Sequence, residues 1–375
     1  MVRYNQSVFT LALKNLWQER VKFILSIGGV SFAIVLMVVL LGVYEGFKGQ
    51  FVINITKNPA HAFVVQEGIR DFFHGVSIIP EETGNKIKNI DGILEAIPMV
   101  GVRAIIDLND KKWDLLLFSF VNDSTLGAPW NVVEGTDQLS ENEMVVDQRF
   151  MNNNNLTLGD KLNANGQEFT IAGIAKDASS ILTSFAFIRL EDAQRLSKLG
   201  NAAGFYSIRV TDATKLDDII ATIENETEGL NAFSKQEFID NNMAEIEEGY
   251  LPIVSAMVVI AFIVGVAIIA LTVYTATIDK SREYGILKAI GIKHVQLYKV
   301  VFFQSLISSI LGFIIGVSLS YVTSYILYTN MGLHSVITGQ TLVYVFAVVL
   351  VMSVIATFVP IRRITQIDPA EVFKS

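Results

Sequence analysis

The segment from Asp279 to Lys299 carries side chains suited to binding another protein rather than to breaking bonds. Its charges are mainly positive, because Asp279 and Glu283 are outnumbered by Lys280, Arg282, Lys288, Lys293 and Lys299. Apolar residues recur at helical spacing, namely Ile286, Leu287 and Ile290 with Tyr284 one turn earlier. Gly291 predicts the end of this helix. A short basic helix with an apolar stripe suits the groove of a partner protein; a loop lying on lipid headgroups is the alternative.

The motifs of covalent catalysis and nucleotide binding are missing from the sequence. There is no G-x-x-x-x-G-K-S/T phosphate loop, no H-E-x-x-H, no G-x-S-x-G and no protein-kinase signature. Cysteine is absent, and the four histidines, His61, His74, His294 and His334, are scattered along the chain. We therefore expect no catalytic residue, no bound metal and no cofactor in this chain, and an outside domain without disulfides.

Long uncharged stretches predict an integral membrane protein. Hydrophobic residues make up 51% of the chain, and the mean hydropathy is +0.45. A crossing needs about 20 apolar residues, so the uncharged stretches fit four transmembrane helices with a large α+β domain between the first two. The expected order is an amphipathic helix at 1–20, spans at 21–44, 251–277, 300–328 and 342–361, a domain at 45–250, a polar helix and loop at 278–299, an outer loop at 329–341 and a tail at 362–375.

The distribution of charge predicts the orientation. Residues 45–250 contain 17 Lys or Arg and 32 Asp or Glu, a net charge of −15, whereas the rest contains 12 and 5, a net charge of +7. Short cytoplasmic loops carry an excess of Lys and Arg. Residues 278–299 and both termini are therefore expected in the cytoplasm, the protein being multi-pass in the cell (inner) membrane. The acidic domain then lies outside, and nucleic acid is not an expected partner.

Residues 1–20 show the pattern of an amphipathic helix that lies in the headgroup layer of the bilayer. The apolar residues are Val8, Leu11, Leu13, Leu16 and Trp17, and the polar ones include Asn5, Lys14, Gln18 and Arg20. A plain basic lead-in to the first span is the alternative. A signal peptide is disfavoured, because the apolar run that follows is too long and no small-residue cleavage site comes after it.

Residues 45–250 predict a mixed α+β domain of two lobes, divided near Leu126–Glu143. Runs typical of strands recur between turn residues, at Ala62–Gln66, Trp113–Val121, Glu143–Asp147 and Glu168–Ala175. A later strand, helix and strand predict a βαβ unit, at Phe205–Thr211, Leu216–Glu226 and Gly229–Phe233. The aromatic corner Phe72–Gly75 is expected to lie against its own domain, with a contact to substrate or a partner as the alternative.

The uncharged run Phe23–Tyr44 and the other three predicted spans contain no Asp, Glu, Lys, Arg or His side chain. Carriers driven by protons or ions keep such groups at mid-membrane, so another source of energy is expected. Before the second span, Lys235–Glu248 predicts an acidic helix that either transmits movement from the domain or serves as a plain connector. Gly312 and Gly316 allow close helix packing, and a contact between two copies is one use of them.

The order of these parts resembles the FtsX-like permease family of type VII ABC transporters. Its members include MacB-type exporters, lipoprotein-releasing permeases, and DevC-like and haem-export permeases. The resemblance covers essentially the whole chain, and it rests on Arg282–Gly291 after the second span, on Ile367–Glu371 near the C-terminus, and on the turn LTLGDKL followed by GQEFTIAGI. The macrolide exporter itself carries a fused ATPase domain, which this sequence does not have.

The resemblance implies the transmembrane subunit of an ATP-driven ABC exporter that extrudes or extracts an amphipathic or hydrophobic substrate by mechanical transmission. ATP and Mg²⁺ would bind a separate ABC ATPase, so this chain itself is not an enzyme. The docking residues carried over from the family are Arg282, Glu283, Tyr284, Gly285, Leu287, Lys288, Ala289 and Gly291. Haem-export relatives suggest a ligand contact at Tyr44, Glu45 and Tyr250.

The same resemblance implies further partners, and two other functions are the alternatives to export. A second permease copy is expected, with a homodimer favoured over a heterodimer, as is the lipid bilayer; a membrane-fusion adaptor is a further candidate. A non-transporting FtsX-like signalling subunit would regulate an outside partner such as a cell-wall hydrolase, although the outside domain typical of that branch is shorter. A membrane-anchored enzyme would place its active site within 45–250, where the sequence offers only carboxylate pairs.

Overall fold

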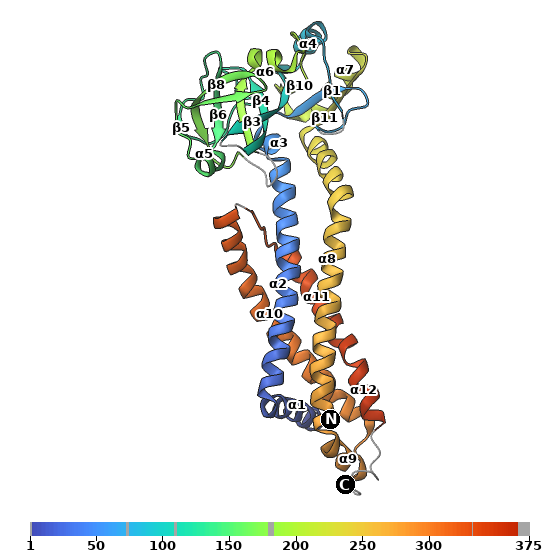
Figure 1. The fold of residues 1–375 in the computed structure, drawn as a ribbon. Coiled ribbons are helices and arrows are strands. Elements are labelled where there is room, and N and C mark those ends of the chain that lie inside the picture. Colours follow the sequence, from blue (N-terminus) through green and yellow to red (C-terminus); the bar gives the residue numbers. More distant parts are fainter. Residues whose placement is uncertain (1, 73–74, 109–110, 179–183, 332, 367–375) are drawn as a thin grey trace. The chain divides into compact units, whose positions relative to one another are not determined.

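The computed structural model describes residues 2–72, 75–108, 111–178, 184–331 and 333–366. It divides into two compact units, a membrane unit of residues 1–46 and 250–375 and a domain unit of residues 47–249 (Figure 1). Four helices in the described chain are long and apolar enough to cross a membrane, at Arg20–Phe51, Lys235–Asp279, His294–Asn330 and Gly339–Thr365.

The membrane unit is helical throughout its described elements. Its helices are α1 (Val2–Gln18), α2 (Arg20–Phe51), α8 (Lys235–Asp279), α9 (Ser281–Ala289), α10 (His294–Met331), α11 (Gly339–Ala356) and α12 (Phe358–Thr365). Two of them, α2 and α8, run on into the domain unit. The acidic helix predicted at Lys235–Glu248 is therefore the first part of α8, which accommodates Pro252 in its interior. The predicted fourth span comprises α11 and the start of α12, which meet at Thr357.

Glycines let the membrane helices approach closely. A Cβ at Gly312 of α10 would lie 2.6 Å from Val30 Cγ1 of α2, and one at Gly316 would lie 2.8 Å from Ile34 Cβ. The hydroxyl of Ser31 donates to the carbonyl of Gly312 over 3.1 Å. Lipid supplies no hydrophobic driving force for helix association, so van der Waals packing at small residues stabilises such crossings instead. Both glycines are thus covered by α2 of the same chain and offer no surface to a second copy.

The domain unit contains eleven strands in its described part, arranged in two sheets. They are β1 (Ala62–Gln66), β2 (Ile93–Met99), β3 (Gly101–Leu108), β4 (Lys111–Phe120), β5 (Val132–Gly135), β6 (Glu143–Asp147), β7 (Lys161–Ala164), β8 (Gln167–Ala175), β9 (Ser184–Arg189), β10 (Phe205–Val210) and β11 (Leu230–Ser234). Its helices are α3 (Ile53–Lys57), α4 (Glu81–Lys88), α5 (Gln148–Asn154), α6 (Leu190–Ser197), η1 (Ala213–Lys215) and α7 (Leu216–Glu226). The mixed α+β fold predicted from the sequence is confirmed.

The larger sheet closes into a small barrel. Its order is β5-β8-β6-β9-β4-β3-β7, and β7 also pairs with β8, so six strands form a ring and β5 is appended to β8. Inward residues alternate with outward ones, as in other small barrels. Leu115 and Leu117 of β4 belong to the interior cluster, whereas Leu116 and Phe118 lie on the opposite face. We call this part the barrel lobe.

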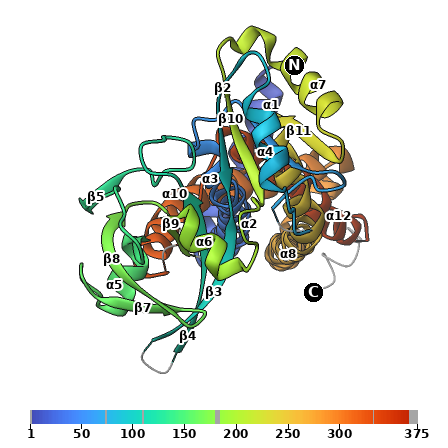
Figure 2. The same cartoon turned by 90° about the horizontal axis from the view of Figure 1, so that it is seen from above.

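The smaller sheet has the order β11-β1-β10-β2. It contains a βαβ unit whose two strands, β10 and β11, are separated by β1 from an earlier part of the chain. β1 is antiparallel to both β10 and β11, so these two strands are parallel to each other and α7 connects them. The helices α4 and α7 lie beside this sheet (Figure 2). Their Ile87 and Ile223 belong to the same buried cluster as Val64 of β1. We call this part the split lobe.

The lobe boundary predicted near Leu126–Glu143 is wrong. The chain enters the barrel lobe between Met99 and Gly101, where β2 ends and β3 begins, and it returns to the split lobe after α6. Residues 126–143 lie within the barrel lobe. Pro98 and Gly101 flank the junction at Val100, but both lie within strands, and β2 and β3 follow each other with only Val100 between them.

An aromatic core joins the two lobes to the first turns of α8. The ring of Phe238 on α8 stacks on Phe63 of β1 at 5.0 Å and lies edge-on to Phe72 at 4.9 Å. Phe72 also contacts Phe205 of β10 at 4.8 Å and Phe118 of β4 at 6.1 Å. The prediction that this aromatic corner lies against its own domain is confirmed for Phe72; residues 73 and 74 lie outside the described residues.

Candidate functional site

The helix predicted around Arg282–Gly291 exists as α9, and its end is defined by backbone hydrogen bonds. Gly291 has a φ of +92°, a conformation that glycine adopts without strain. Its N–H donates to the carbonyl of Lys288 over 3.0 Å, and the N–H of Ile292 donates to the carbonyl of Leu287 over 3.1 Å. This pair of bonds is a Schellman motif. The predicted helix stop at Gly291 is confirmed, and it separates α9 from α10.

One face of α9 is buried against the membrane unit. Tyr284 is 2% exposed and Gly285 is also buried, while Leu287 is half-buried against the same core cluster. Burial raises the pKa of the Tyr284 hydroxyl to about 12, since the ionised form would lose its hydration. Tyr284 therefore stays neutral over the whole physiological range and anchors α9.

A buried lysine attaches the start of α9 to α1. Lys280 is 5% exposed, and its Nζ donates to Asn15 Oδ1 over 2.9 Å and to Gln18 Oε1 over 2.5 Å. Close by, Lys22 pairs with Asp279 and, over 3.2 Å, with Glu19. Hydrogen bonds to a charged group are the stronger kind. The ammonium group of Lys280 thus fixes α9 relative to the amino-terminal helix.

A second lysine attaches the end of α9 to α12. The Nζ of Lys288 donates to the carbonyl of Ile364 over 2.6 Å and to that of Thr365 over 3.3 Å. These carbonyls lie in the last turn of α12, where helix carbonyls lack partners inside the helix and a cation is favoured. Figure 1 shows α1, α9 and α12 at the same end of the membrane helices.

The amino-terminal helix has two faces. Ala12, Asn15 and Leu16 are buried, with Ala12 in one cluster with Val300 of α10, whereas Leu13 and Trp17 are 39% and 61% exposed. The apolar residues predicted for one side of this helix therefore divide between the protein and the outside. The side chains of Asn5 and Val8 lie outside the described residues.

The opposite face of α9 is exposed and partly apolar. Ile286 is 39% exposed and Ile290 is 75% exposed, and they lie one turn apart. We define the α9 surface as Arg282, Glu283, Ile286, Ala289 and Ile290, all of which are exposed. A pair of isoleucines flanked by charges, on a helix fixed at both ends, has the form of a helix that inserts into a partner's groove.

The structure divides the eight predicted docking residues into two groups. Arg282, Glu283, Ala289 and Gly291 are exposed. The other four face the rest of the membrane unit, where Lys288 contacts α12. They are Tyr284, Gly285, Leu287 and Lys288. The set did not include Ile286 and Ile290, although their spacing of four residues was a visible signal. It also did not include Lys280, whose burial has no local signature.

The three residues predicted to contact a ligand lie on two helices. Tyr44 is buried and Glu45 is half-buried, both on α2, whereas Tyr250 on α8 is 44% exposed. Their role stays a prediction. Among the described histidines, His61 accepts a hydrogen bond from the N–H of Val210 through Nδ1 over 3.1 Å. Across the described ranges, no group of three or more His, Cys, Asp or Glu side chains is placed to hold a metal ion.

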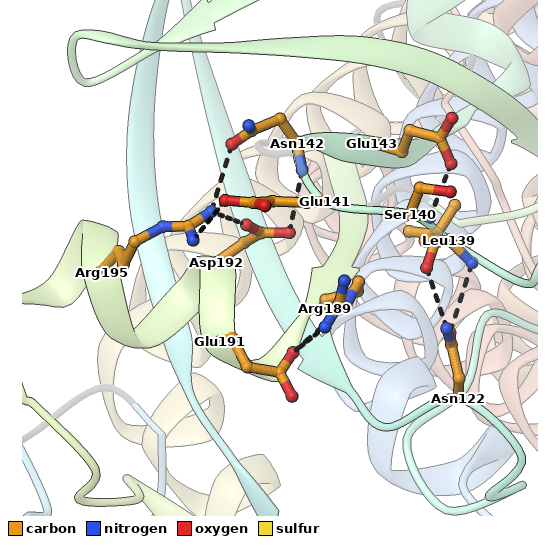
Figure 3. Close-up of polar contacts among 10 residues, drawn as sticks. All are labelled: Asn122, Leu139, Ser140, Glu141, Asn142, Glu143, Arg189, Glu191, Asp192 and Arg195. Atoms are coloured by element: carbon orange, nitrogen blue, oxygen red, sulfur yellow. Dashed lines mark hydrogen bonds and ion pairs between the residues drawn. The ribbon is translucent and has the colours of Figure 1, made fainter.

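A polar cluster in the barrel lobe shows what the acidic side chains do there (Figure 3). Asp192, 1% exposed in the first turn of α6, accepts from the N–H of Asn142 over 3.3 Å and pairs with Arg195. Arg195 also binds Glu141 over 2.8 Å. Burial raises the pKa of the Asp192 carboxyl, and Arg195 partly offsets this. These contacts fasten the 139–143 turn to α6, which is a structural role.

Similarity to known protein families identifies the class of this protein and then its family. Residues 255–369 match the FtsX-like permease C-terminal family, and residues 23–226 match the MacB-like periplasmic core domain family. The protein is thus a multi-pass membrane protein with an extracytoplasmic domain between its first two spans. It belongs to the FtsX-like permeases with a MacB-like periplasmic core domain, and it is an ABC transporter permease subunit. Such subunits lack the ATPase domain and imply an ATPase partner.

Individual relatives are distant but cover most of the chain. The putative hemin transport system permease protein HrtB of Staphylococcus haemolyticus is 21% identical over 336 residues, which covers 88% of this chain and 89% of that protein. An uncharacterised ABC transporter permease of Mycobacterium bovis is 20% identical over 358 residues, covering 95% and 96%. The periplasmic region of MacB from Actinobacillus actinomycetemcomitans aligns with a TM-score of 0.38 at 12% identity, over 53% of this chain and 98% of that chain.

Proposed function

We propose that this permease receives mechanical force from a cytoplasmic ABC ATPase through the α9 surface and uses it to export or extract an amphipathic or hydrophobic substrate. The observation that carries this proposal is the geometry of α9. Its outer face presents Ile286 and Ile290, and its two ends are fixed by Lys280 and Lys288 to α1 and α12. A force applied to α9 therefore acts on α1 and α12 as well.

The proposed orientation places α1, α9 and α12 in the cytoplasm, together with both termini, in the cell membrane. The support is the excess of Lys and Arg in 278–299 and at both ends of the chain, since short cytoplasmic segments carry such an excess. The exposed Leu13 and Trp17 of α1 would then lie in the inner headgroup layer.

Two continuous helices are the proposed transmission elements. α2 and α8 each extend from the membrane unit into the domain unit without a break. Within the domain unit, Lys48 of α2 pairs with Glu247 of α8 over 2.6 Å, and Phe238 of α8 is fully buried in the aromatic core between the lobes. Movement of α8 would therefore reach both lobes.

The substrate and the second subunit are further parts of the proposal. A relative is named a putative hemin transport permease, and Tyr44, Glu45 and Tyr250 are the residues that we propose for a ligand contact at the outer membrane edge. Apolar residues of α8, among them Ile253, Met257 and Ile260, are exposed, and we propose that a second copy of the chain or lipid covers them. An adaptor of the membrane-fusion type would join at the domain unit.

A pair of matched substitutions tests the ATPase contact. Ile290→Asp places a charge in the α9 surface, and Ile105→Asp makes the same change at a 53% exposed position of β3 in the domain unit. Truncation of a central anchor residue in an interface costs about 2 kcal/mol or more, so co-purification of the ATPase with Ile290→Asp should fall about tenfold or more. Ile105→Asp should retain it. Equal recovery of the ATPase with both variants would refute the docking role of α9.

Export is separated from regulation of an outside partner by a transport measurement. With the ATPase bound, an exporter lowers the cellular content of an amphipathic dye, and Ile290→Asp abolishes this loss. An unchanged dye content, together with intact ATPase binding, would favour the non-transporting signalling function.

A further inference from the structure

A cavity of about 170 Å³ lies in the domain unit where the two lobes meet. Its walls are mainly apolar, with the rings of Phe72, Phe118 and Phe205 and the aliphatic side chains of Val65, Val100 and Leu116. Gly75 and Val76 also line it and are exposed, so that the cavity reaches the surface on that side.

The sheet pattern explains why this space is apolar on both sides. In β4, Leu115 and Leu117 point into the barrel, so Leu116 and Phe118 point out of it toward the junction. In β1, Val64 faces the cluster under α4 and α7, so Val65 faces the junction. Each lobe thus has an apolar face directed toward the junction in addition to the face that covers its own core. The cavity lies between these two junction faces.

The size and lining of the cavity define a class of ligand. An apolar cavity of about 150 Å³ holds a benzene molecule in another protein. The present cavity therefore fits a single ring or a short alkyl group. Asp71 and Ser77, both buried, also belong to the wall. Because the wall is mainly apolar, it disfavours a charged group inside.

One wall residue is attached directly to α8. The N–H of Phe72 donates to Asn242 Oδ1 over 3.1 Å, and Asn242 is fully buried on α8, where its Nδ2 donates to the carbonyl of Phe238 over 2.7 Å. The ring of Phe72 also lies edge-on to that of Phe238 at 4.9 Å. Phe72 therefore joins the cavity to α8 through both its backbone and its side chain.

We propose that this cavity binds the ring or short alkyl group of a neutral amphipathic molecule, and that its occupancy displaces Phe72 and thereby α8. That the bound molecule is the exported substrate rests on the proposed function. Binding itself does not, because the cavity lies wholly within the domain unit and needs no ATPase.

The binding test uses 4-fluorobenzyl alcohol and the full-length protein in lipid nanodiscs, followed by ligand-observed ¹⁹F NMR, with empty nanodiscs as the measure of partition into lipid. The native chain should show a saturable signal above that background. Leu116→Trp fills the cavity and should reduce this signal about tenfold. Leu94→Trp makes the same change at a 59% exposed position of β2 outside the cavity wall and should leave it unchanged. 4-Fluorobenzoate should bind more weakly than the alcohol.

Absence of a saturable signal in the native chain, or an equal signal in Leu116→Trp, would overturn the proposal. If Leu116→Trp does not fold, Leu116→Cys gives a single thiol, since the chain contains no cysteine. 4-Fluorobenzyl alcohol should slow the reaction of this thiol with N-ethylmaleimide, and it should leave the thiol of Leu94→Cys unaffected. Equal rates with and without the alcohol at Leu116→Cys would also overturn the site.

The response of α8 is read from a spin label on Ala244→Cys, an exposed position two residues beyond Asn242. The label's spectrum should change on addition of 4-fluorobenzyl alcohol in the native background and stay constant in Leu116→Trp. A constant spectrum in both, despite binding, would refute the link from the cavity to α8. None of these measurements involves the ATPase, so their failure is distinct from failure of the ATPase contact.

Discussion

Lys280→Met tests whether the buried ammonium group holds α1 against α9. Methionine keeps the length of the side chain but removes the donors to Asn15 and Gln18, whose side-chain oxygens then lose their partner. A hydrogen bond to a charged group contributes about 1.5–3 kcal/mol. Two such bonds are lost, but the exposed side chain of Gln18 can bond to water instead, so the docking of α1 should weaken by about 2–4 kcal/mol. At 1.4 kcal/mol per tenfold, the population of undocked α1 should rise about 30- to 700-fold.

The assay is the reactivity of a thiol placed on the docked face of α1. Leu16→Cys introduces a single thiol at a position that is 9% exposed, in a chain without cysteine. When local opening is fast relative to labelling, the rate of reaction with a maleimide follows the equilibrium for opening. Labelling in the Lys280→Met background should therefore accelerate about 30-fold or more.

Lys299→Met is the matched control, because it removes a lysine of the same polar segment that is exposed on α10. It should leave the labelling rate within about threefold of the parent, as is usual for exposed charges. If Lys280→Met also stayed within about threefold, the bonds from Lys280 to α1 would contribute no docking energy, and the attachment of α9 to α1 would have to rest on other contacts.

Three further predictions concern the packing of α9 and α10. Gly291→Val forces a β-branched residue to a φ of +92°, which should cost roughly 1–3 kcal/mol and lower permease-stimulated ATPase activity; an unchanged activity would show that the Schellman motif is dispensable. Tyr284→Phe removes a group whose pKa is raised to about 12. The unfolded state releases this proton near pH 10, whereas the folded state keeps it, so the free energy of unfolding of the parent chain should fall by about 2–3 kcal/mol between pH 10 and 12. In urea or heat unfolding, the free energy of unfolding of Tyr284→Phe should fall by about 2–3 kcal/mol less over the same pH range. Gly312→Val meets Val30 of α2 and should cost roughly 1–3 kcal/mol in the thermal unfolding of the detergent-solubilised chain, whereas Gly28→Val, which has open space around it, should have little effect; equal melting temperatures would exclude the close crossing.

The sequence was sufficient for features that depend on local pattern. The strands Ala62–Gln66 and Glu143–Asp147 and the helix Leu216–Glu226 begin and end where their turn residues and periodicity predict. The stop at Gly291 was predictable for the same reason, since only its own φ and two neighbouring carbonyls are involved.

Features that depend on distant contacts were not predictable in this way. Successive residues of a helix point about 100° apart, so a stripe containing Ile286, Leu287 and Ile290 does not reveal which side faces its own protein. The burial of Lys280 depends on Asn15, 265 residues away. The insertion of β1 between β10 and β11 likewise joins segments far apart in the chain. At the lobe boundary, Pro98 and Gly101 lie within β2 and β3, so these residues form no turn that would mark it.

The most direct test of the central claim is photo-crosslinking from the α9 surface. A benzophenone-maleimide attached to Ile290→Cys, in the otherwise cysteine-free chain, should form a covalent adduct with the co-purifying ATPase polypeptide on illumination. The same reagent on Val343→Cys, a 72% exposed position in the first turns of α11, should form none. An adduct from Val343→Cys and none from Ile290→Cys would contradict the claim that α9 receives the force of the ATPase.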